Sequence, residues 1–109
     1  MRDIQFADVR YRTGPFGVVL WTFTLNNRNS RVAYREVRYQ TTYRDAKGDV
    51  VDQGYDYIKD IFEPGALRQI EVNDGIIRVP FTSATIVLTA AEALLPAVTD
   101  APAAAPTGP

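Results

Sequence analysis

Strict alternation of apolar and polar residues is the feature of this sequence that most constrains its fold. The clearest run is FGVVLWTFTLN, residues 16–26, in which every second residue is large and apolar. The apolar positions are Val19, Trp21, Phe23 and Leu25. A period of two places alternate side chains on opposite faces of a β-strand, so one face is buried and the other meets solvent. The run therefore predicts a central strand.

The same period recurs through most of the chain. Residues 3–12 alternate in two phases, which predicts a β-bulge near Ala7 and Asp8. Residues 34–44 alternate cleanly, and further strands are expected at 49–58, 67–73, 76–81 and 83–90. About seven strands separated by turn residues every 8–12 positions are typical of an immunoglobulin-like antiparallel β-sandwich. We therefore predict an all-β fold of that kind.

The C-terminal part of the sequence changes character. Residues 90–96, AAEALLP, suit a single helical turn, and residues 97–109 are rich in alanine and proline with no face to bury. We predict one domain at residues 1–96 and a flexible tail or linker at 97–109. A chain of 109 residues is long enough for one hydrophobic core.

The segment YRDAKGDVVDQGYDY, residues 43–57, predicts a β-hairpin. A loop of Ala46, Lys47 and Gly48 suits a type I turn closed by a left-handed glycine, and it sets Asp45 opposite Asp49. The register that follows buries the tyrosines of both strands and exposes the later aspartates. Its central pairs are Tyr43 with Val51, Thr41 with Gln53, Tyr39 with Tyr55, Val37 with Tyr57, and Arg38 with Asp56.

Composition excludes several kinds of chemistry. The chain has no cysteine and no histidine, which removes thiol nucleophiles, histidine bases and zinc sites built from these ligands. A net charge of −1 provides no general attraction for nucleic acid or anionic membranes. We expect a protein that is not an enzyme and uses no cofactor.

The aspartates raise the question of a cation site. From Asp45 onward the sequence lacks the glycine of a calcium-binding loop and has Lys47 at a ligand position, so the motif fails. Glycoside hydrolysis would need two carboxylates across a cleft, which exposed strand aspartates do not supply. Asp45 and Asp49, two like charges facing each other, remain weak candidates for a metal ion, or for a carbohydrate at this loop end.

A protein-interaction surface is the preferred hypothesis. The solvent face of the hairpin is expected to carry Arg35, Arg38, Arg44 and Asp56. Acidic residues beside these arginines argue against a nucleic-acid surface. Phe62, in the loop before Pro64 and Gly65, is either an apolar plug on the end of the sandwich or part of a partner-binding loop.

Several of these segments together resemble a known family. A Trp/Phe strand ending in Asn26 and Asn27, the motif TYRDAKGDV at 42–50, and Glu63-Pro64-Gly65 before another strand are similar to FxLYD-type immunoglobulin-like domains of bacteria and archaea. The resemblance covers residues 16–90. It implies an accessory domain, often associated with the cell envelope, without catalytic residues.

The function expected is therefore a non-enzymatic structural or protein-interaction module, an accessory subunit of a larger assembly. The alternative is a ligand-binding module at Asp45 and Asp49. No apolar run reaches the roughly 20 residues of a membrane span. As written, the sequence predicts a cytoplasmic protein; if Met1 stands in place of a removed export signal, an exported or periplasmic protein is expected.

Overall fold

The structure, a computed structural model, describes residues 3–94, which form six β-strands and one short 3-10 helix. The strands are β1 (Ile4–Thr13), β2 (Val18–Asn27), β3 (Ala33–Arg44), β4 (Val50–Ile58), β5 (Leu67–Ile76) and β6 (Ser83–Leu94), and the helix is η1 (Pro15–Gly17). The helix lies in the turn between β1 and β2. Strands thus make up most of the described chain.

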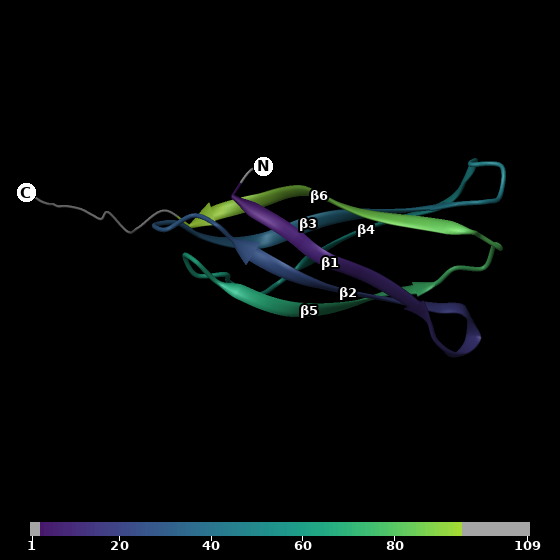
Figure 1. Ribbon diagram of the computed structural model, residues 1–109, viewed down its shortest axis with the longest axis horizontal. Helices are drawn as coiled ribbons and strands as arrows, with labels where there is room; N and C mark the ends of the chain where they lie inside the picture. The colour runs from purple at the N-terminus through teal and green to yellow at the C-terminus, as the bar shows by residue number, and fades with distance from the viewer. Residues whose placement is uncertain (1–2, 95–109) are drawn as a thin grey trace, which may run out of the picture.

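The strands form two antiparallel sheets that face each other (Figure 1). Sheet A has the order β1-β2-β5 and sheet B the order β4-β3-β6. The prediction of an all-β, immunoglobulin-like sandwich is confirmed, with six strands in the described residues where about seven were expected. Residues 77–82 form no strand, and the predicted turn at 73–75 lies inside β5.

The predicted helical turn at 90–96 is wrong as far as the structure describes it, because β6 stays extended to Leu94. Leu95, Pro96 and the predicted tail at 97–109 lie outside the described residues. Within residues 3–94, no helix has the length and apolar character needed to cross a membrane.

The alternating run at 16–26 behaves as predicted. It forms β2, the middle strand of sheet A, and its four apolar side chains are at most 1% exposed. The bulge expected in the first strand is also present: the pairing of β1 with β2 shifts between Ala7 and Arg10, and Asp8 has φ of 53°. A bulge explains why the alternation of residues 3–12 changes phase.

Strand β3 occupies the middle of sheet B and supplies the facing half of the core. Val37, Tyr39, Thr41 and Tyr43 are all at most 3% exposed, as their alternation predicted. A second bulge lies at Glu36, whose φ is 48°. It adds one residue to the strand, so that Tyr34 and Val37, three positions apart, both point inward.

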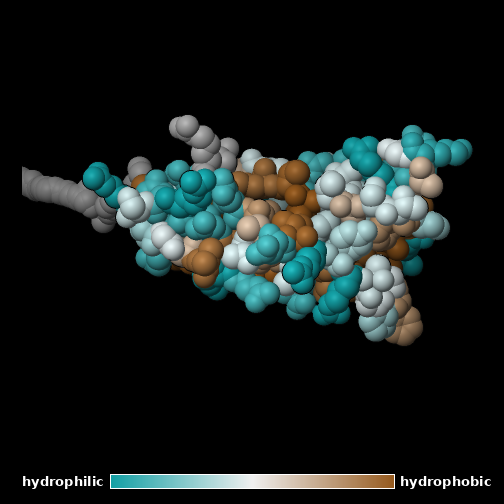
Figure 2. Space-filling model, in the orientation of Figure 1, coloured by the Kyte–Doolittle hydropathy of each residue, from teal (hydrophilic) through white to brown (hydrophobic). Residues whose placement is uncertain are grey.

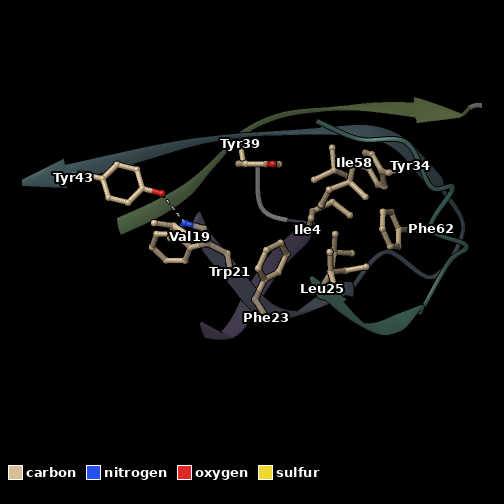
Figure 3. Packing of buried hydrophobic residues seen from close by; sticks show 12 residues of the cluster. Ile4, Val19, Trp21, Phe23, Leu25, Tyr34, Tyr39, Tyr43, Ile58 and Phe62 are labelled. Atoms are coloured by element: carbon tan, nitrogen blue, oxygen red, sulfur yellow. Dashed lines mark hydrogen bonds between the residues drawn. The ribbon is translucent and has the colours of Figure 1, made fainter. Parts of the chain in front are cut away.

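The core between the sheets is aromatic and contains a polar centre (Figure 3). The indole Nε1–H of Trp21 donates to the hydroxyl of Tyr43 at 3.0 Å, across the gap between the sheets. That hydroxyl donates to Asp74 Oδ2, which also accepts from Thr41 Oγ1 at 2.6 Å. Asp74 comes from β5, so both sheets contribute to this cluster. Buried polar groups are tolerated when they are hydrogen-bonded in this way.

Candidate interaction surface

The β3–β4 hairpin has the predicted turn but a different register. Gly48 has φ of 88° and closes the loop, and Arg44 pairs with Val50 as expected. The pairing then shifts by one residue, so Tyr43 lies opposite Asp52, Tyr39 opposite Asp56 and Val37 opposite Ile58. The predicted pairs beyond Arg44 are therefore wrong, because a bulge at the start of β4 adds one residue to that strand.

The polar centre of the core explains this register. In the structure Gly54 lies opposite Thr41, and an added Cβ there would be 2.6 Å from Thr41 Oγ1 and 2.9 Å from Asp74 Oδ1. The predicted register would set Gln53 opposite Thr41, where the Asp74 carboxylate already occupies the space. A glycine is the residue that leaves room for an acid reaching across from the other sheet.

The shift exchanges the two faces of β4. Tyr55 and Tyr57, expected in the core, are 69% and 39% exposed. They lie next to β3 residues that point to solvent, with Tyr55 paired to Gln40 and Tyr57 paired to Arg38. Aromatic side chains exposed together on a sheet face are a common feature of protein interaction sites.

We call Arg38, Tyr55 and Tyr57 the tyrosine–arginine face. The guanidinium of Arg38 lies 5.3 Å from the centroid of the Tyr57 ring, within the range of a cation–π contact, and it also forms an ion pair with Glu36 at 2.9 Å. These contacts hold an exposed arginine in place. The expected pair of Arg38 with Asp56 is absent, because Tyr57 takes the position opposite Arg38.

A hollow of about 390 Å³ lies at this face. It is lined by Arg38, Tyr39, Tyr55, Asp56, Tyr57 and Thr89. The structure therefore brings together two of the predicted surface residues, Arg38 and Asp56, although not as an ion pair. Asp56 accepts a hydrogen bond from the backbone N–H of Tyr57 at 2.8 Å.

Burial and nearby acids raise the pKa of two tyrosines of β3, Tyr39 at this hollow and Tyr43 further along the strand. Burial, followed by the charges of Asp56 and Asp74, raises the pKa of Tyr39 to about 12. Burial and the hydrogen bond to Asp74 also raise the pKa of Tyr43. Both hydroxyls stay protonated at neutral pH, and that of Tyr43 donates to Asp74 Oδ2.

The other predicted surface arginines are exposed. Arg35 forms a two-point ion pair with Glu92 of β6, at 3.0 and 3.2 Å, which raises the pKa of Arg35 and lowers that of Glu92. Arg44 donates to the carbonyl of Gly48 at 3.0 Å and so fastens the hairpin loop. Exposed ion pairs of this kind contribute little to stability, because solvent screens the two charges.

The Asp45–Asp49 loop is explained without a cation. Asp45 Oδ1 accepts the backbone N–H groups of Lys47 and Asp49, at 2.9 and 3.0 Å, and the backbones of Asp45 and Asp49 pair with each other. The carboxylate thus holds the turn, as aspartate commonly does. Within residues 3–94 no group of three or more acidic side chains is placed to hold a metal ion.

Phe62 is not available to a partner. Its side chain is fully buried, its backbone pairs with Tyr34, and the guanidinium of Arg68 lies 5.0 Å from its ring centroid. The expectation that Phe62 belongs to an interaction surface is therefore wrong. Of the two readings of this loop, the apolar plug matches the structure.

Asn27 fastens the loop that carries Phe62. It is fully buried, and its side-chain amide donates to the carbonyls of Val32, Phe62 and Glu63. Its Oδ1 accepts the backbone N–H of Asn29 at 3.0 Å. A single buried amide thus joins two loops at one end of the sandwich.

A second hollow, of about 400 Å³, lies beside the β1 bulge and includes Asp8, Tyr11 and Gln69. It contains none of the predicted site residues. Tyr55 and Tyr57 are the surface residues that the sequence did not reveal as such. The signal that could have placed them was Gly54, since a glycine in mid-strand often marks a close approach of other groups.

Comparison with known proteins gave no relative: no family model matches the chain, and no similar protein was found among curated proteins or solved structures.

Proposed function

We propose that the chain is a non-enzymatic protein-interaction module, an accessory unit of a larger assembly, whose partner binds the tyrosine–arginine face. The observation that carries this proposal is the exposure of Tyr55 and Tyr57 beside a positioned Arg38 at a hollow in sheet B. Tyrosine and arginine are among the residue types enriched at the energetic centres of protein interfaces.

The chemistry of the face supports a protein partner. Its rings provide flat apolar area with few rotatable bonds, and Arg38 offers guanidinium donors that suit a carboxylate of the partner. Asp56, at the same hollow, is an acceptor for a basic or amide group. The resemblance to FxLYD-type domains, which implies an accessory and often envelope-associated domain, points in the same direction.

The test compares partner capture by matched variants. The chain, immobilised through its C-terminus, is exposed to extract from its source, and the retained proteins are quantified for wild type, Arg38→Glu and Tyr55→Ala. A specific partner should lose about 2 kcal/mol of binding energy, roughly thirtyfold in affinity, in each variant. Charge reversal at Arg44, on the same sheet, should weaken capture less because Arg44 lies at the hairpin end.

The control is Arg10→Glu, which reverses an exposed charge on sheet A and should leave capture unchanged. Circular dichroism of all variants establishes that they remain folded. A partner that is retained equally by Arg38→Glu and Tyr55→Ala, or lost with Arg10→Glu, would show that the binding surface lies elsewhere.

A further inference from the structure

The turn between β1 and β2 has an unusual residue at its centre. Phe16 and Gly17 both have positive φ, at 62° and 82°, and the N–H of Val18 bonds to the carbonyl of Pro15. These are the features of a type I′ turn, whose two central positions favour asparagine, aspartate and glycine. Gly17 suits the second position. A phenylalanine at the first position is strained, because its Cβ is crowded by the backbone at positive φ.

Packing within the chain does little to offset this strain. The side chain of Phe16 is 91% exposed, more than that of any other large hydrophobic residue in the described chain. Strained conformations of this kind cluster at binding sites, and a sequence that breaks a local rule without a gain in packing usually does so for function. Phe16 therefore indicates a binding role that folding does not explain.

A second loop adds apolar surface beside this turn. The backbone N–H of Ile77 donates to the carbonyl of Gly17 at 3.1 Å, which holds residues 77–82 against the turn. Ile76 and Val79 are 46% and 42% exposed. We call residues 13–17 and 77–82 the tip loops.

Both tip loops lie at one end of the molecule. Figure 1 shows the β1–β2 turn and the connection from β5 to β6 at the end opposite to the one where β1 begins and β6 ends. In Figure 2, drawn in the same orientation, the β1–β2 turn projects from the body of the molecule and has hydrophobic surface at its tip. The described chain thus begins and ends far from the tip loops.

The tip loops are suited to an apolar environment. Their one charged residue is Arg78, and they contain no acid. Pro15 and Pro80 have no N–H group, and the N–H groups of Gly14 and Ile77 are bonded to backbone carbonyls at 2.7 and 3.1 Å. This reduces the number of backbone donors that would be left unpaired when the loops leave water.

We propose that the tip loops insert into the surface of a lipid bilayer that contains anionic phospholipid. Phe16 is the anchor, at the boundary between headgroups and acyl chains, and Val79 lies beside it. Arg78, which forms no ion pair within residues 3–94, meets the lipid phosphates. Apolar side chains on one side and a cation at the level of the headgroups are typical of segments that lie in a membrane surface.

Shape and charge favour a bilayer over a cavity in another protein. The apolar surface comes from two loops, and a bilayer accommodates both without a matching shape. The third loop at this end, the β3–β4 hairpin, carries Asp45, Lys47 and Asp49 and would stay among the hydrated headgroups. Because the two aspartates oppose the attraction of the cations for anionic lipid, insertion of the apolar side chains supplies the larger part of the affinity.

Membrane contact goes beyond the proposed function and does not depend on it. The tyrosine–arginine face lies along the strands of sheet B and not at their end, so a protein partner can bind it while the tip loops contact a bilayer. Arg38→Glu and Tyr55→Ala should therefore bind vesicles as wild type does. Failure of either proposal leaves the other standing.

The test measures co-sedimentation of the chain with vesicles of phosphatidylcholine and with vesicles of an equimolar mixture of phosphatidylcholine and phosphatidylglycerol. Wild type should bind both, and the mixed vesicles more tightly. Phe16→Asn should lower the partition coefficient at least about tenfold, because burial of the phenylalanine side chain is lost. Arg78→Glu should weaken binding to the mixed vesicles more than to phosphatidylcholine alone. The matched control is Leu67→Asn, which removes a side chain that is 68% exposed at the opposite end and should leave binding unchanged.

Thermal unfolding separates binding from folding. Asparagine suits the first central position of a type I′ turn, so Phe16→Asn should melt at the same temperature as wild type or higher. A Phe16→Trp variant locates the contact. Trp21 is buried, so a shift of the emission to shorter wavelength on adding vesicles, and quenching by lipids brominated in their acyl chains, report on residue 16.

Several results would overturn the proposal. They are a wild-type chain that binds neither kind of vesicle at millimolar lipid, equal binding by Phe16→Asn, and an emission of Phe16→Trp that vesicles leave unchanged. A lower melting temperature of Phe16→Asn would show that Phe16 supports the fold instead. Absence of vesicle binding, together with a captured protein that is lost with Phe16→Asn but retained by Leu67→Asn, would assign the projection to a protein cavity.

Discussion

Asn27→Asp is the substitution whose effect follows most directly from the structure. It exchanges the amide NH₂ for an oxygen of nearly the same shape, at a site that is fully buried. The amide donates to the carbonyl oxygens of Val32, Phe62 and Glu63 at 2.9, 3.1 and 3.0 Å. An ionised aspartate has no proton to donate and would face three carbonyl oxygens.

The magnitude is obtained from these contacts. The carbonyls of Phe62 and Glu63 keep a second partner, the backbone N–H groups of Tyr34 and Ala66. Losing the two N–H donors of the amide lowers the free energy of unfolding by about 1–3 kcal/mol. The carbonyl of Val32 also loses the hydrogen bond from Asn27, which lowers the free energy of unfolding by about another 1–3 kcal/mol. The free energy of unfolding should therefore fall by about 2–6 kcal/mol at pH 7.

The destabilisation should depend on pH. Burial and the facing carbonyls favour the protonated acid, so the pKa of the new carboxyl is raised in the folded state above its unfolded value of about 3.9. A raised pKa means that the folded state binds the proton more tightly. The stability lost relative to wild type is then smallest below about pH 4 and grows as pH rises through the folded-state pKa.

The assay is urea unfolding of wild type and of Asn27→Asp at a series of pH values from about 3.5 to 7. This range begins near the unfolded-state pKa of the new carboxyl and extends through its raised folded-state pKa. The matched control is Asn26→Asp, the same chemical change one residue earlier, where the side chain points to the other face of β2. A loss of stability that is equal in the two variants, or that does not vary with pH, would refute the reasoning.

Three further predictions concern the core and the hairpin loop. Gly54→Ala should lower the free energy of unfolding by about 1–3 kcal/mol in urea titrations, because the added Cβ would clash with Thr41 and Asp74. In the control, Gly14→Ala, the added Cβ has no neighbouring atom closer than 3.8 Å, so the free energy of unfolding should change by less than about 0.5 kcal/mol. Wild type should lose stability as pH rises from about 10 to 12. The pKa of Tyr39 is raised in the folded state, so the unfolded chain releases the Tyr39 proton at a lower pH than the folded chain does. Tyr39 alone should then lower the free energy of unfolding by about 1.4 kcal/mol per pH unit in this range. Tyr39→Phe should have a shallower dependence in the same range, and equal slopes would contradict the burial argument. Millimolar calcium or a chelator should leave the melting temperature unchanged, since the Asp45 carboxylate already accepts two backbone N–H groups; a calcium-dependent rise would revive the cation hypothesis.

The alternating pattern predicted the strands well where one face of a strand is wholly buried. Strands β2 and β3 each have a hydrogen-bonded strand on both sides, which fixes their register. Every second side chain of these strands is therefore buried, as the alternating sequence predicted. The bulge in β1 was visible too, because the apolar positions change phase at Asp8. Turn residues likewise located the hairpin loop at 46–48.

The errors share a physical cause. Strand β4 has apolar residues in both phases, Val50 and Ile58 in one and Val51, Tyr55 and Tyr57 in the other, so its pattern alone does not fix the register. The contact that fixes it comes from Asp74, twenty residues further along the chain and in the other sheet. The sequence left two interpretations of Phe62 open for a similar reason, because its burial depends on pairing with Tyr34.

The surface of this protein therefore follows from a partly buried carboxylate between its two sheets. Asp74 crosses between the sheets to accept the hydroxyl protons of Thr41 and Tyr43, and its carboxylate admits only a glycine opposite Thr41. Gly54 in that position requires the bulge at the start of β4, and the bulge turns Tyr55 and Tyr57 outward beside Arg38. A purely apolar core would have allowed the tyrosines to remain inside, and the exposed face that we propose for binding would not exist.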